Sequence, residues 1–209
     1  LGTIVVNSPA ALRNVNEKFF ITHFPDCIAP TQVSRNMAVL LDFVAQHGNI
    51  VIKPLDGMGG QGIFRVNATD PNTKVILETI TKNETSYVMA QKYLPEISSG
   101  DKRILLINGE PVPYVLARIP AEGEFRGNLA QGGNGKGLEL SERDRWICQQ
   151  VGPKLRDMGL FFVGLDVIGD YLTEINITSP TCIRELDNLY NINISEELMG
   201  VLEKYKQEQ

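Results

Sequence analysis

The sequence is poor in several features that would place it in large classes of protein. Its three cysteines, Cys27, Cys148 and Cys182, are scattered through 209 residues, so we expect no disulfide framework and favour the reducing cytoplasm as its environment. The longest apolar stretches fall far short of the about 20 residues that a membrane-spanning helix requires. No membrane crossing is therefore expected, and the start of the chain does not resemble a secretory signal.

An excess of basic residues is also missing. The formal net charge is −5, whereas a nucleic-acid binder needs clustered Lys and Arg to neutralise phosphates, so we expect no nucleic-acid partner. Hydrophobic residues make up 43% of the chain and charged residues 22%, which is the balance of a globular protein with a sizeable core. The length fits one large domain or two small lobes that share a ligand, and we favour two lobes.

The spacing of apolar residues alternates between helical and strand-like along the chain. Helices are predicted from residue 9, at 15–24, 37–46, 71–81, from 141 to about 157, and at 196–205. Strands are predicted at 50–52, 63–66 and 87–91, with hairpins over 103–115 and 162–175. Six glycines fall between residues 119 and 137, a density that is typical of a long mobile loop.

A glycine-rich segment lies between two of the predicted strands. Residues 57–62 match the G-x-G-x-x-G pattern of dinucleotide-binding folds, but that pattern requires a following helix and residues 63–66 are strand-like. No Gly-Lys-Ser/Thr follows, so the segment is not a Walker A loop either. Glycine loops let backbone N–H groups approach phosphate oxygens, and Lys53 on the preceding strand adds positive charge. A phosphate-binding loop is favoured over a hairpin without a ligand.

Three oxygen-bearing side chains occur on the last predicted hairpin. Glu174 and Asn176 are two residues apart and so share a face of one strand, and Asp166 lies on the other strand. Mg²⁺ prefers hard oxygen ligands and keeps waters and nucleotide phosphates, so two carboxylates and an amide suit it. They do not suit zinc, which would want His or Cys. The alternative is that they are solvated hairpin residues, but their apolar neighbours favour central strands.

Several longer motifs together resemble one known family. Ile52-Lys-Pro-Leu-Asp-Gly-Met-Gly-Gly60, Asp101-Lys-Arg103, Glu110-Pro-Val-Pro113, Arg126-Gly-Asn128 and Glu174-Ile-Asn-Ile-Thr-Ser-Pro-Thr181 are similar to motifs of the bacterial glutathione synthetases. These enzymes belong to the ATP-grasp superfamily, and the similarity extends over nearly the whole chain. The resemblance implies an α+β fold in which two α+β lobes clasp ATP between them.

The resemblance also implies roles for individual residues. The nucleotide would be bound by Lys18, Lys53, Asp56, Gly57, Gly59, Gly60, Gln91, Lys92, Tyr93, Leu94 and Asp101. Within this set, residues 91–94 would hydrogen-bond adenine and Asp101 would accept from the ribose. Arg103, Arg118, Arg126 and Asn128 would face the phosphates or the forming acyl phosphate as catalytic residues. Asp166, Glu174 and Asn176 would bind Mg²⁺, with Mn²⁺ as an alternative metal.

The family also implies an organisation of the chain and a reaction. Residues 1–15 would be a linker from an N-terminal domain that precedes Leu1, residues 16–90 a small lobe with the glycine loop, and residues 91–209 a large lobe with the metal site and a lid loop at 119–137. The reaction would be an ATP-dependent joining of γ-glutamylcysteine to glycine through an acyl phosphate, in a cytoplasmic protein that is compatible with homo-oligomer formation.

Two other functions stay open at this point. One is a different ATP-grasp ligase with another acid or amine as substrate, although Arg118-Ile-Pro120 and Ser179-Pro-Thr181 argue for the glutathione synthetases. The other is a nucleotide-binding module without turnover. Product formation would distinguish between them.

Overall fold

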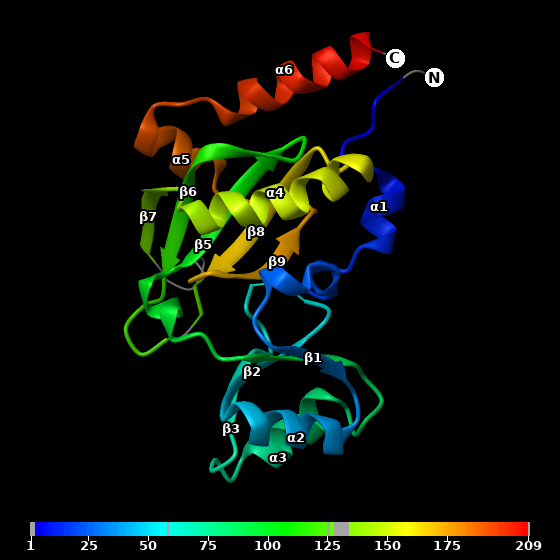
Figure 1. Ribbon diagram of the computed structural model, residues 1–209, viewed down its shortest axis with the longest axis vertical. Coiled ribbons are helices and arrows are strands. Elements are labelled where there is room, and N and C mark those ends of the chain that lie inside the picture. Colours follow the sequence, from blue (N-terminus) through cyan, green and yellow to red (C-terminus); the bar gives the residue numbers. More distant parts are fainter. Residues whose placement is uncertain (1–2, 58, 125, 128–133, 209) are drawn as a thin grey trace.

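The chain folds around two antiparallel β-sheets. In the computed structural model, which describes residues 3–57, 59–124, 126–127 and 134–208, one sheet has four strands and the other has five. The five-stranded sheet occupies the upper part of Figure 1 and the four-stranded sheet the lower part. Each sheet has helices packed on it, so the chain forms two α+β lobes.

The smaller sheet has the strand order β1-β4-β2-β3. The strands are β1 (Thr31–Ser34), β2 (Asn49–Pro54), β3 (Phe64–Asn67) and β4 (Val88–Lys92). Two helices, α2 (Met37–His47) and α3 (Thr73–Ile80), lie on the side away from the larger sheet (Figure 1). Because side chains alternate along a strand, Ile50 and Ile52 pack beneath these helices whereas Val51 and Lys53 face the larger sheet.

Local signals set the limits of α2 as the sequence predicts. The Asn36 side chain accepts a hydrogen bond from the Val39 backbone N–H at 3.1 Å, which satisfies one of the donors left free at a helix start. Gly48, at φ 70, ends the helix in a conformation that residues with a Cβ rarely adopt. The predicted helix at 37–46 is confirmed and extends one residue further, to His47.

The larger sheet has the strand order β7-β6-β5-β8-β9. The strands are β5 (Asp101–Ile107), β6 (Glu110–Ile119), β7 (Asn134–Glu139), β8 (Phe162–Ile168) and β9 (Tyr171–Asn176). The hairpin β8–β9 places Asp166 directly opposite Glu174. A short helix, η3 (Pro95–Ser99), connects β4 of the smaller sheet to β5.

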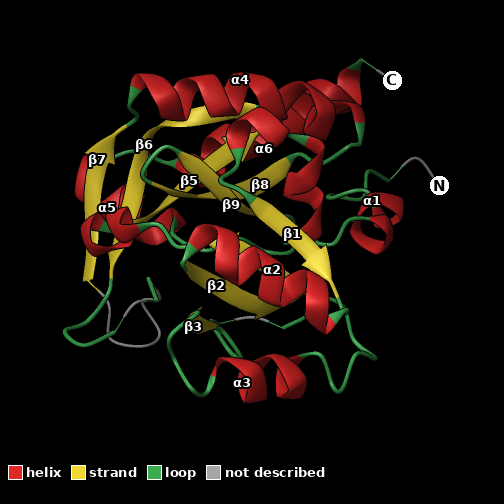
Figure 2. Ribbon diagram, turned by 60° about the horizontal axis from the view of Figure 1, so that its bottom comes forward, coloured by secondary structure: helices red, strands yellow, loops and turns green. Residues whose placement is uncertain are grey.

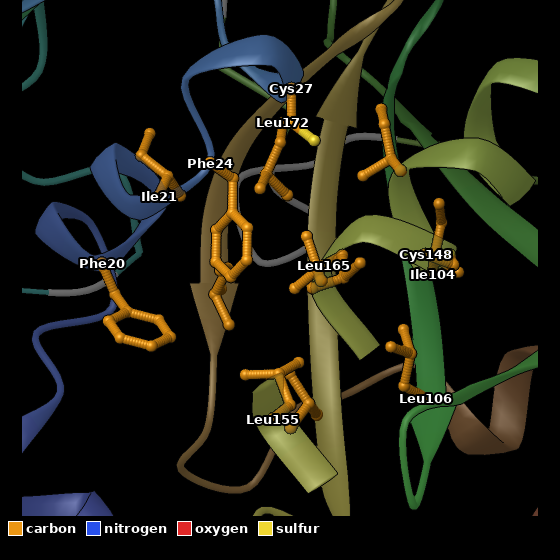
Figure 3. Packing of buried hydrophobic residues seen from close by; sticks show 14 of the residues in the cluster. Phe20, Ile21, Phe24, Cys27, Ile104, Leu106, Cys148, Leu155, Leu165 and Leu172 are labelled. Carbon is orange, nitrogen blue, oxygen red and sulfur yellow. The ribbon is translucent and has the colours of Figure 1, made fainter. Parts of the chain in front are cut away.

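One face of the larger sheet is apolar along its length. It packs against α4 (Glu142–Asp157) and an N-terminal segment that contains α1 (Pro9–Asn14) and the 3-10 helices η1 (Phe19–His23) and η2 (Pro25–Cys27). Figure 3 shows this core, in which Phe20 and Phe24 from the N-terminal segment and Leu155 from α4 pack with Leu165 of the sheet. The core fixes the N-terminal segment against β8 and β9.

The opposite face of the larger sheet is divided. One part is apolar, with Leu105, Ile107 and Leu116 covered by α5 (Ile183–Tyr190) and α6 (Ile194–Gln207). The other part carries charged residues on the same strands, including Arg103 and Asp166. Figure 2 shows the two sheets from a second direction. The charged residues of this face line the same cleft as Val51 and Lys53 of the smaller sheet. They therefore lie between the lobes.

Two expectations for the N-terminal part are wrong. Residues 15–24 do not form an α-helix, because the Asn16 side chain accepts from the backbone N–H groups of Lys18 and Phe19, and only the short helix η1 follows. Residues 16–29 were expected in the smaller lobe, but Phe20, Phe24 and Cys27 are buried in the core of the larger sheet. The boundary between the lobes therefore lies nearer to β1 than the sequence indicates.

Two strands, β1 and β7, and the helix α5 were not expected from the sequence, nor were the short 3-10 helices η2 and η3. The glycine-rich stretch 119–137 was expected to be a loop, but Ile119 ends β6 and residues 134–137 belong to β7. The central part of that predicted lid, residues 128–133, lies outside the described residues, and the lid stays a prediction. Among the residues that are described, no helix is both long and apolar enough to cross a membrane.

Helix α4 touches the turn between β5 and β6 through two glycines. A Cβ atom at position 109 would lie 2.6 Å from the Gly152 carbonyl oxygen, and one at position 152 would overlap the Gly109 carbonyl oxygen. Gly109 also has φ 83, which favours glycine. The two backbones are in direct contact at this point, and this contact sets the distance of α4 from the sheet.

This contact predicts an unusual result for Gly152→Ala. Alanine in a helix interior normally stabilises by up to about 1 kcal/mol relative to glycine, but here the added methyl group should lower the free energy of unfolding by roughly 1–3 kcal/mol through overpacking. Urea denaturation would measure it. Gly200→Ala in α6 is the matched control, since nothing lies within 4 Å of its Cβ position, and it should stabilise. Equal stabilisation by both changes would contradict the close contact.

Candidate active site

A cleft of about 550 Å³ lies between the two sheets. This volume is within the range of small-molecule sites. The smaller sheet contributes residues from β2, the glycine loop and the end of β4, and the larger sheet contributes residues from β5, β6, β8 and β9. The segment after β9, residues 178–181, also lines the cleft. A ligand in this cleft would touch both lobes.

Two buried lysines stand on one side of the cleft. Lys53, near the end of β2, donates from Nζ to the carbonyl oxygen of Thr173 at 3.1 Å, and Lys18 donates to the carbonyl oxygen of Gly57 at 2.8 Å. Lys18 Nζ also lies 3.3 Å from Glu174 Oε1. Burial lowers the pKa of Lys53, and nearby Glu174 only partly offsets this effect. An anionic ligand would therefore relieve the cost of keeping this ammonium group buried.

The glycine loop connects β2 to β3, which are antiparallel neighbours. The predicted strand-loop-strand arrangement is confirmed, and because no helix opens after the loop, a dinucleotide-binding fingerprint is excluded. Gly57 has φ 96 and Gly60 has φ 77, values that favour glycine and allow backbone to approach a ligand closely. Met58 lies outside the described residues.

A buried network of charges forms the opposite side of the cleft. Asp166 on β8 accepts two hydrogen bonds from Arg103, at 2.5 and 3.0 Å, and lies 2.9 Å from Arg118. Arg118 also pairs with Asp101 at 2.5 Å. Burial tends to raise the pKa of Asp166, but the two guanidinium groups outweigh it and hold this pKa below its usual value. Asp166 is therefore ionised in the folded chain.

Asp101 is left incompletely paired in the same network. Its Oδ1 atom is buried and has no hydrogen-bond partner among the described residues. Burial raises the pKa of Asp101 to about 7, because Arg118 compensates only in part and Asp166 repels a second negative charge. A buried acceptor without a partner is costly, so a hydroxyl group of a ligand is a suitable partner for this oxygen.

The predicted metal donors all line the cleft, but each is already engaged by another group of the protein. Asp166 pairs with the two arginines and Glu174 with Lys18, while the Asn176 side chain donates to the Gly164 carbonyl oxygen at 3.3 Å. No group of three or more His, Cys, Asp or Glu residues in the described parts of the chain could hold a metal by itself. Two carboxylates and an amide oxygen nevertheless fit Mg²⁺, which keeps waters and phosphates as its remaining ligands.

Comparison with known proteins identifies the family. A model of the ATP-grasp domain of prokaryotic glutathione synthetase matches residues 17–191. The chain belongs to this family. It is 62% identical over 201 residues to a glutathione synthetase of Pseudomonas aeruginosa, covering 96% of this chain and 63% of that protein. It is 55% identical over 202 residues to a glutathione synthetase of Coxiella burnetii, covering 97% of this chain and 63% of the relative. The chain thus spans just under two thirds of these relatives.

Solved structures agree with the fold of a glutathione synthetase ATP-grasp domain. The ATP-grasp ligase PsnB, in complex with a minimal precursor, Mg and ADP, superposes with a TM-score of 0.71 at 19% identity, covering 99% of this chain and 63% of that one. A D-alanine–D-alanine ligase of Bacillus anthracis gives a TM-score of 0.60 at 16% identity, covering 92% of this chain and 68% of that one. The expected α+β ATP-grasp fold is confirmed.

Most nucleotide-binding residues that the glutathione synthetase motifs indicate line the cleft. Residues 91–94 form its edge where β4 ends, and Gln91 donates to Thr31 Oγ1 at 3.1 Å. The Tyr93 backbone N–H donates to the Asn49 carbonyl oxygen at 3.0 Å, so the edge is held by β2. Asp56 is exposed and is not among the cleft residues.

The predicted catalytic residues are only partly placed. Arg103 and Arg118 lie in the buried network. Arg126 reaches across to the glycine loop, where it donates to the Gly60 carbonyl oxygen at 3.2 Å, and it pairs with Glu124 at 2.5 Å. Asn128 lies outside the described residues.

The cleft also contains residues that the sequence did not single out. Its apolar wall includes Ala29, Val51, Ile63, Ile97, Ile168 and Leu172. Nothing in the sequence separates such residues from core residues, because both are apolar and lie on strands or connections. Glu17 also lines the cleft, although acidic residues are usually solvated surface residues.

The raised pKa of Asp101 predicts a pH effect on stability. Since this pKa is about 7 in the folded chain against an ordinary value of 3.8, the folded state binds the proton more tightly, and the contribution of Asp101 to stability falls as pH rises from about 4 to about 7. Asp101→Asn removes this dependence. Its melting temperature minus that of the wild type should increase between pH 5 and 8 by at least about 2 °C, the shift that roughly 1 kcal/mol produces in a chain of this size.

The matched control is Asp157→Asn, a carboxylate-to-amide change at an exposed position at the end of α4. Its melting temperature should differ from that of the wild type by a constant amount over the same range. A constant difference for Asp101→Asn as well would show that Asp101 does not titrate in this window.

Proposed function

We propose that this chain is the ATP-binding and catalytic part of a glutathione synthetase, a ligase that joins γ-glutamylcysteine to glycine at the expense of ATP. The chain belongs to this family. The observation that carries the proposal is that buried Lys18 and Lys53 line one cleft together with the oxygen-bearing side chains of Asp166, Glu174 and Asn176. Anionic phosphates and a divalent cation are the ligands that such a pairing would suit.

The nucleotide would lie along the cleft. The adenine would occupy the apolar wall and hydrogen-bond the edge at residues 91–94, and a ribose hydroxyl would donate to the unpartnered oxygen of Asp101. Lys18, Lys53 and the backbone of Gly57, Gly59 and Gly60 would face the phosphates.

Mg²⁺, or Mn²⁺ as an alternative, would be held by Glu174, Asn176 and Asp166, and when bound it would neutralise charge on the phosphates. For this to happen, Lys18 would pass from Glu174 to a phosphate oxygen, because an ammonium group and a metal ion compete for the same carboxylate. Asp166 would stay between the arginines and share its oxygens. Contacts within the protein thus position Asp166, Glu174 and Asn176 before a ligand binds.

The chemistry would proceed in two displacements. The C-terminal carboxylate of the dipeptide attacks the γ-phosphorus of ATP, ADP leaves, and an acyl phosphate forms. The amine of glycine then attacks the acyl carbon, phosphate leaves and the amine loses a proton. Arg103, Arg118 and Arg126 would stabilise the charge that develops on the transferring phosphoryl group, so catalysis would come from positioning and electrostatics rather than from a protein nucleophile.

One observation favours a narrower function for the chain on its own. The chain spans only 63% of the Pseudomonas aeruginosa relative, and the narrower function assigns dipeptide binding to residues outside this chain. In that case the chain alone binds nucleotide without turnover, and the complete gene product makes glutathione. Another ATP-grasp ligase activity would be shown by a product formed from a different acid or amine.

The test is formation of glutathione, ADP and phosphate by the complete gene product and its variants. Glu174→Gln and Asn176→Ala each remove an oxygen ligand whose charge stabilisation is usually worth several kcal/mol, so turnover at fixed Mg²⁺ should fall by about 100-fold or more. Urea denaturation should show much smaller changes, below about 1 kcal/mol.

Glu139→Gln is the matched control, because Glu139 is also on an edge strand of the larger sheet but is exposed on β7. It should keep wild-type turnover. Near wild-type rates for both Glu174→Gln and Asn176→Ala would remove the metal assignment, and a complete gene product that consumes ATP without making glutathione would remove the proposed reaction.

A further inference from the structure

Glu17 is a carboxylate of the cleft to which the proposed function gives no role. Its Oε1 atom accepts hydrogen bonds from the backbone N–H groups of Ile177 at 2.7 Å and of Thr178 at 3.0 Å. Its own backbone carbonyl oxygen accepts from the Ile175 N–H at 3.0 Å. A single residue of the N-terminal segment therefore takes up three backbone donors of a segment that lies 160 residues further along the chain.

These three donors flank Asn176. Strand β9 is at the edge of the larger sheet, so the N–H groups on its outer side have no neighbouring strand to pair with. Glu17 supplies acceptors on both sides of Asn176, before it at Ile175 and after it at Ile177 and Thr178. The carbonyl oxygen of Ile177 is held as well, by the Asn7 side chain at 2.9 Å. The backbone that carries Asn176 is thus fixed from outside the sheet.

Glu17 is itself rigidly placed. The helix η1 that follows it lies beside β9 (Figure 1), and Phe20 and Ile21 of this helix are buried in the core shown in Figure 3. Its neighbours connect to the other lobe, since Asn16 donates to the Leu55 carbonyl oxygen at 3.2 Å and Lys18 to the Gly57 carbonyl oxygen at 2.8 Å. Residues 16–18 thus tie β9 to the start of the glycine loop.

We propose that Glu17 is a positioning residue, which fixes the backbone around Asn176 and the first residues of the segment 178–181, so that the Asn176 side chain and this segment keep their places in the cleft. For the metal, this inference rests on the function proposed above. Groups that orient a metal ligand from outside its coordination sphere commonly change metal affinity by about 10–100-fold when they are removed.

The geometry distinguishes this role from a direct one. A metal ligand or a general base needs the negative charge of Glu17, whereas a positioning residue needs an acceptor oxygen at the right distance. Glutamine keeps a carbonyl oxygen at the same reach and can accept from both N–H groups. Aspartate keeps the charge but is shorter by one methylene, about 1.5 Å, and cannot reach them from the same backbone position. The two changes should therefore have opposite outcomes.

The experiment compares Glu17→Gln, Glu17→Asp and Glu17→Ala in the complete gene product. The first measurement is the Mg²⁺ concentration for half-maximal turnover at saturating ATP. It should stay close to wild type for Glu17→Gln and rise by roughly 10–100-fold for Glu17→Asp and Glu17→Ala, with a smaller change in kcat at saturating Mg²⁺. The second measurement is hydrogen exchange without ligands. At Ile177 and Thr178 it should be faster by about tenfold or more in Glu17→Asp and Glu17→Ala only.

Glu84→Ala is the matched control. Glu84 Oε1 accepts from the Met37 backbone N–H at 2.6 Å, so it also joins a carboxylate to a distant backbone, but at the start of α2. Its loss should speed exchange near Met37 and leave the Mg²⁺ dependence unchanged. A similar shift in Mg²⁺ dependence in this control would mean that general loss of stability, not positioning, causes the effect.

Three results would overturn the proposal. Glu17→Gln could be impaired as strongly as Glu17→Ala, which would show that the charge itself is required. Glu17→Asp could match the wild type in both measurements, and exchange at Ile177 and Thr178 could be unchanged in all variants. If Glu17→Ala does not fold, the comparison of Gln with Asp decides. If the wild type shows no Mg²⁺-dependent turnover, the proposed function fails, while the exchange pattern still tests the role of Glu17.

Discussion

Neutralisation of buried charge is the constraint on which this structure depends. All but one of the buried charged side chains of the described residues line the cleft between the sheets, the exception being Asp144, which pairs with Lys102 at 2.5 Å. Burying such groups is costly unless each finds a partner of opposite charge. In the cleft, Asp166 is paired twice, whereas among the described residues Asp101 keeps an unpaired oxygen, and Lys53 donates to the uncharged carbonyl oxygen of Thr173. The ion pairs of Asp166 stabilise the cleft, while Asp101 and Lys53 still have hydrogen-bonding and charge-pairing capacity. A ligand with a hydroxyl group and an anionic group, bound together with a cation, would use this capacity.

The apolar packing of the lobes serves to hold these charges in place. Strands β5, β6 and β8 bury one face against α4 and the N-terminal segment, and their opposite face carries Arg103, Arg118 and Asp166 of the cleft. Residues 16–18 then join the two lobes, because Lys18 reaches the glycine loop while Glu17 holds the backbone around Asn176. The proposed metal donors and the proposed phosphate-binding loop are thus contacted by the same short segment.

The sequence predicts those parts of the fold whose signals are local. Helix α2 has its cap at Asn36 and its stop at Gly48, and α4 begins with the capping box of Ser141 and Asp144. Strand β7 was missed because its glycines are typical of a loop, yet Gly137 is needed where Tyr190 packs, since a Cβ atom there would lie 2.6 Å from the ring. Helix α5 was missed because it follows Cys182 at φ 92 without a side-chain cap. These elements depend on tertiary contacts that no short window of sequence contains.

The same distinction applies to the site. Alternation along β9 placed Glu174 and Asn176 on one face, and the strand-loop-strand pattern located the glycine loop. The ion pairs of Asp166 with Arg103 and Arg118, and the contacts of Glu17, join residues far apart in the chain and appear only in the folded structure. Alternation therefore predicted that Glu174 and Asn176 share a face, but not how the charged residues of the cleft are paired.

The central claim, that the buried charges of the cleft form a nucleotide site, is tested most directly by calorimetric titration of this chain with ATP, with and without millimolar Mg²⁺. The account predicts saturable binding that requires Mg²⁺ and becomes at least about tenfold weaker in Lys53→Met, which removes the charge but keeps an unbranched side chain. Absence of binding to a folded sample, or binding that is the same in Lys53→Met, would contradict it.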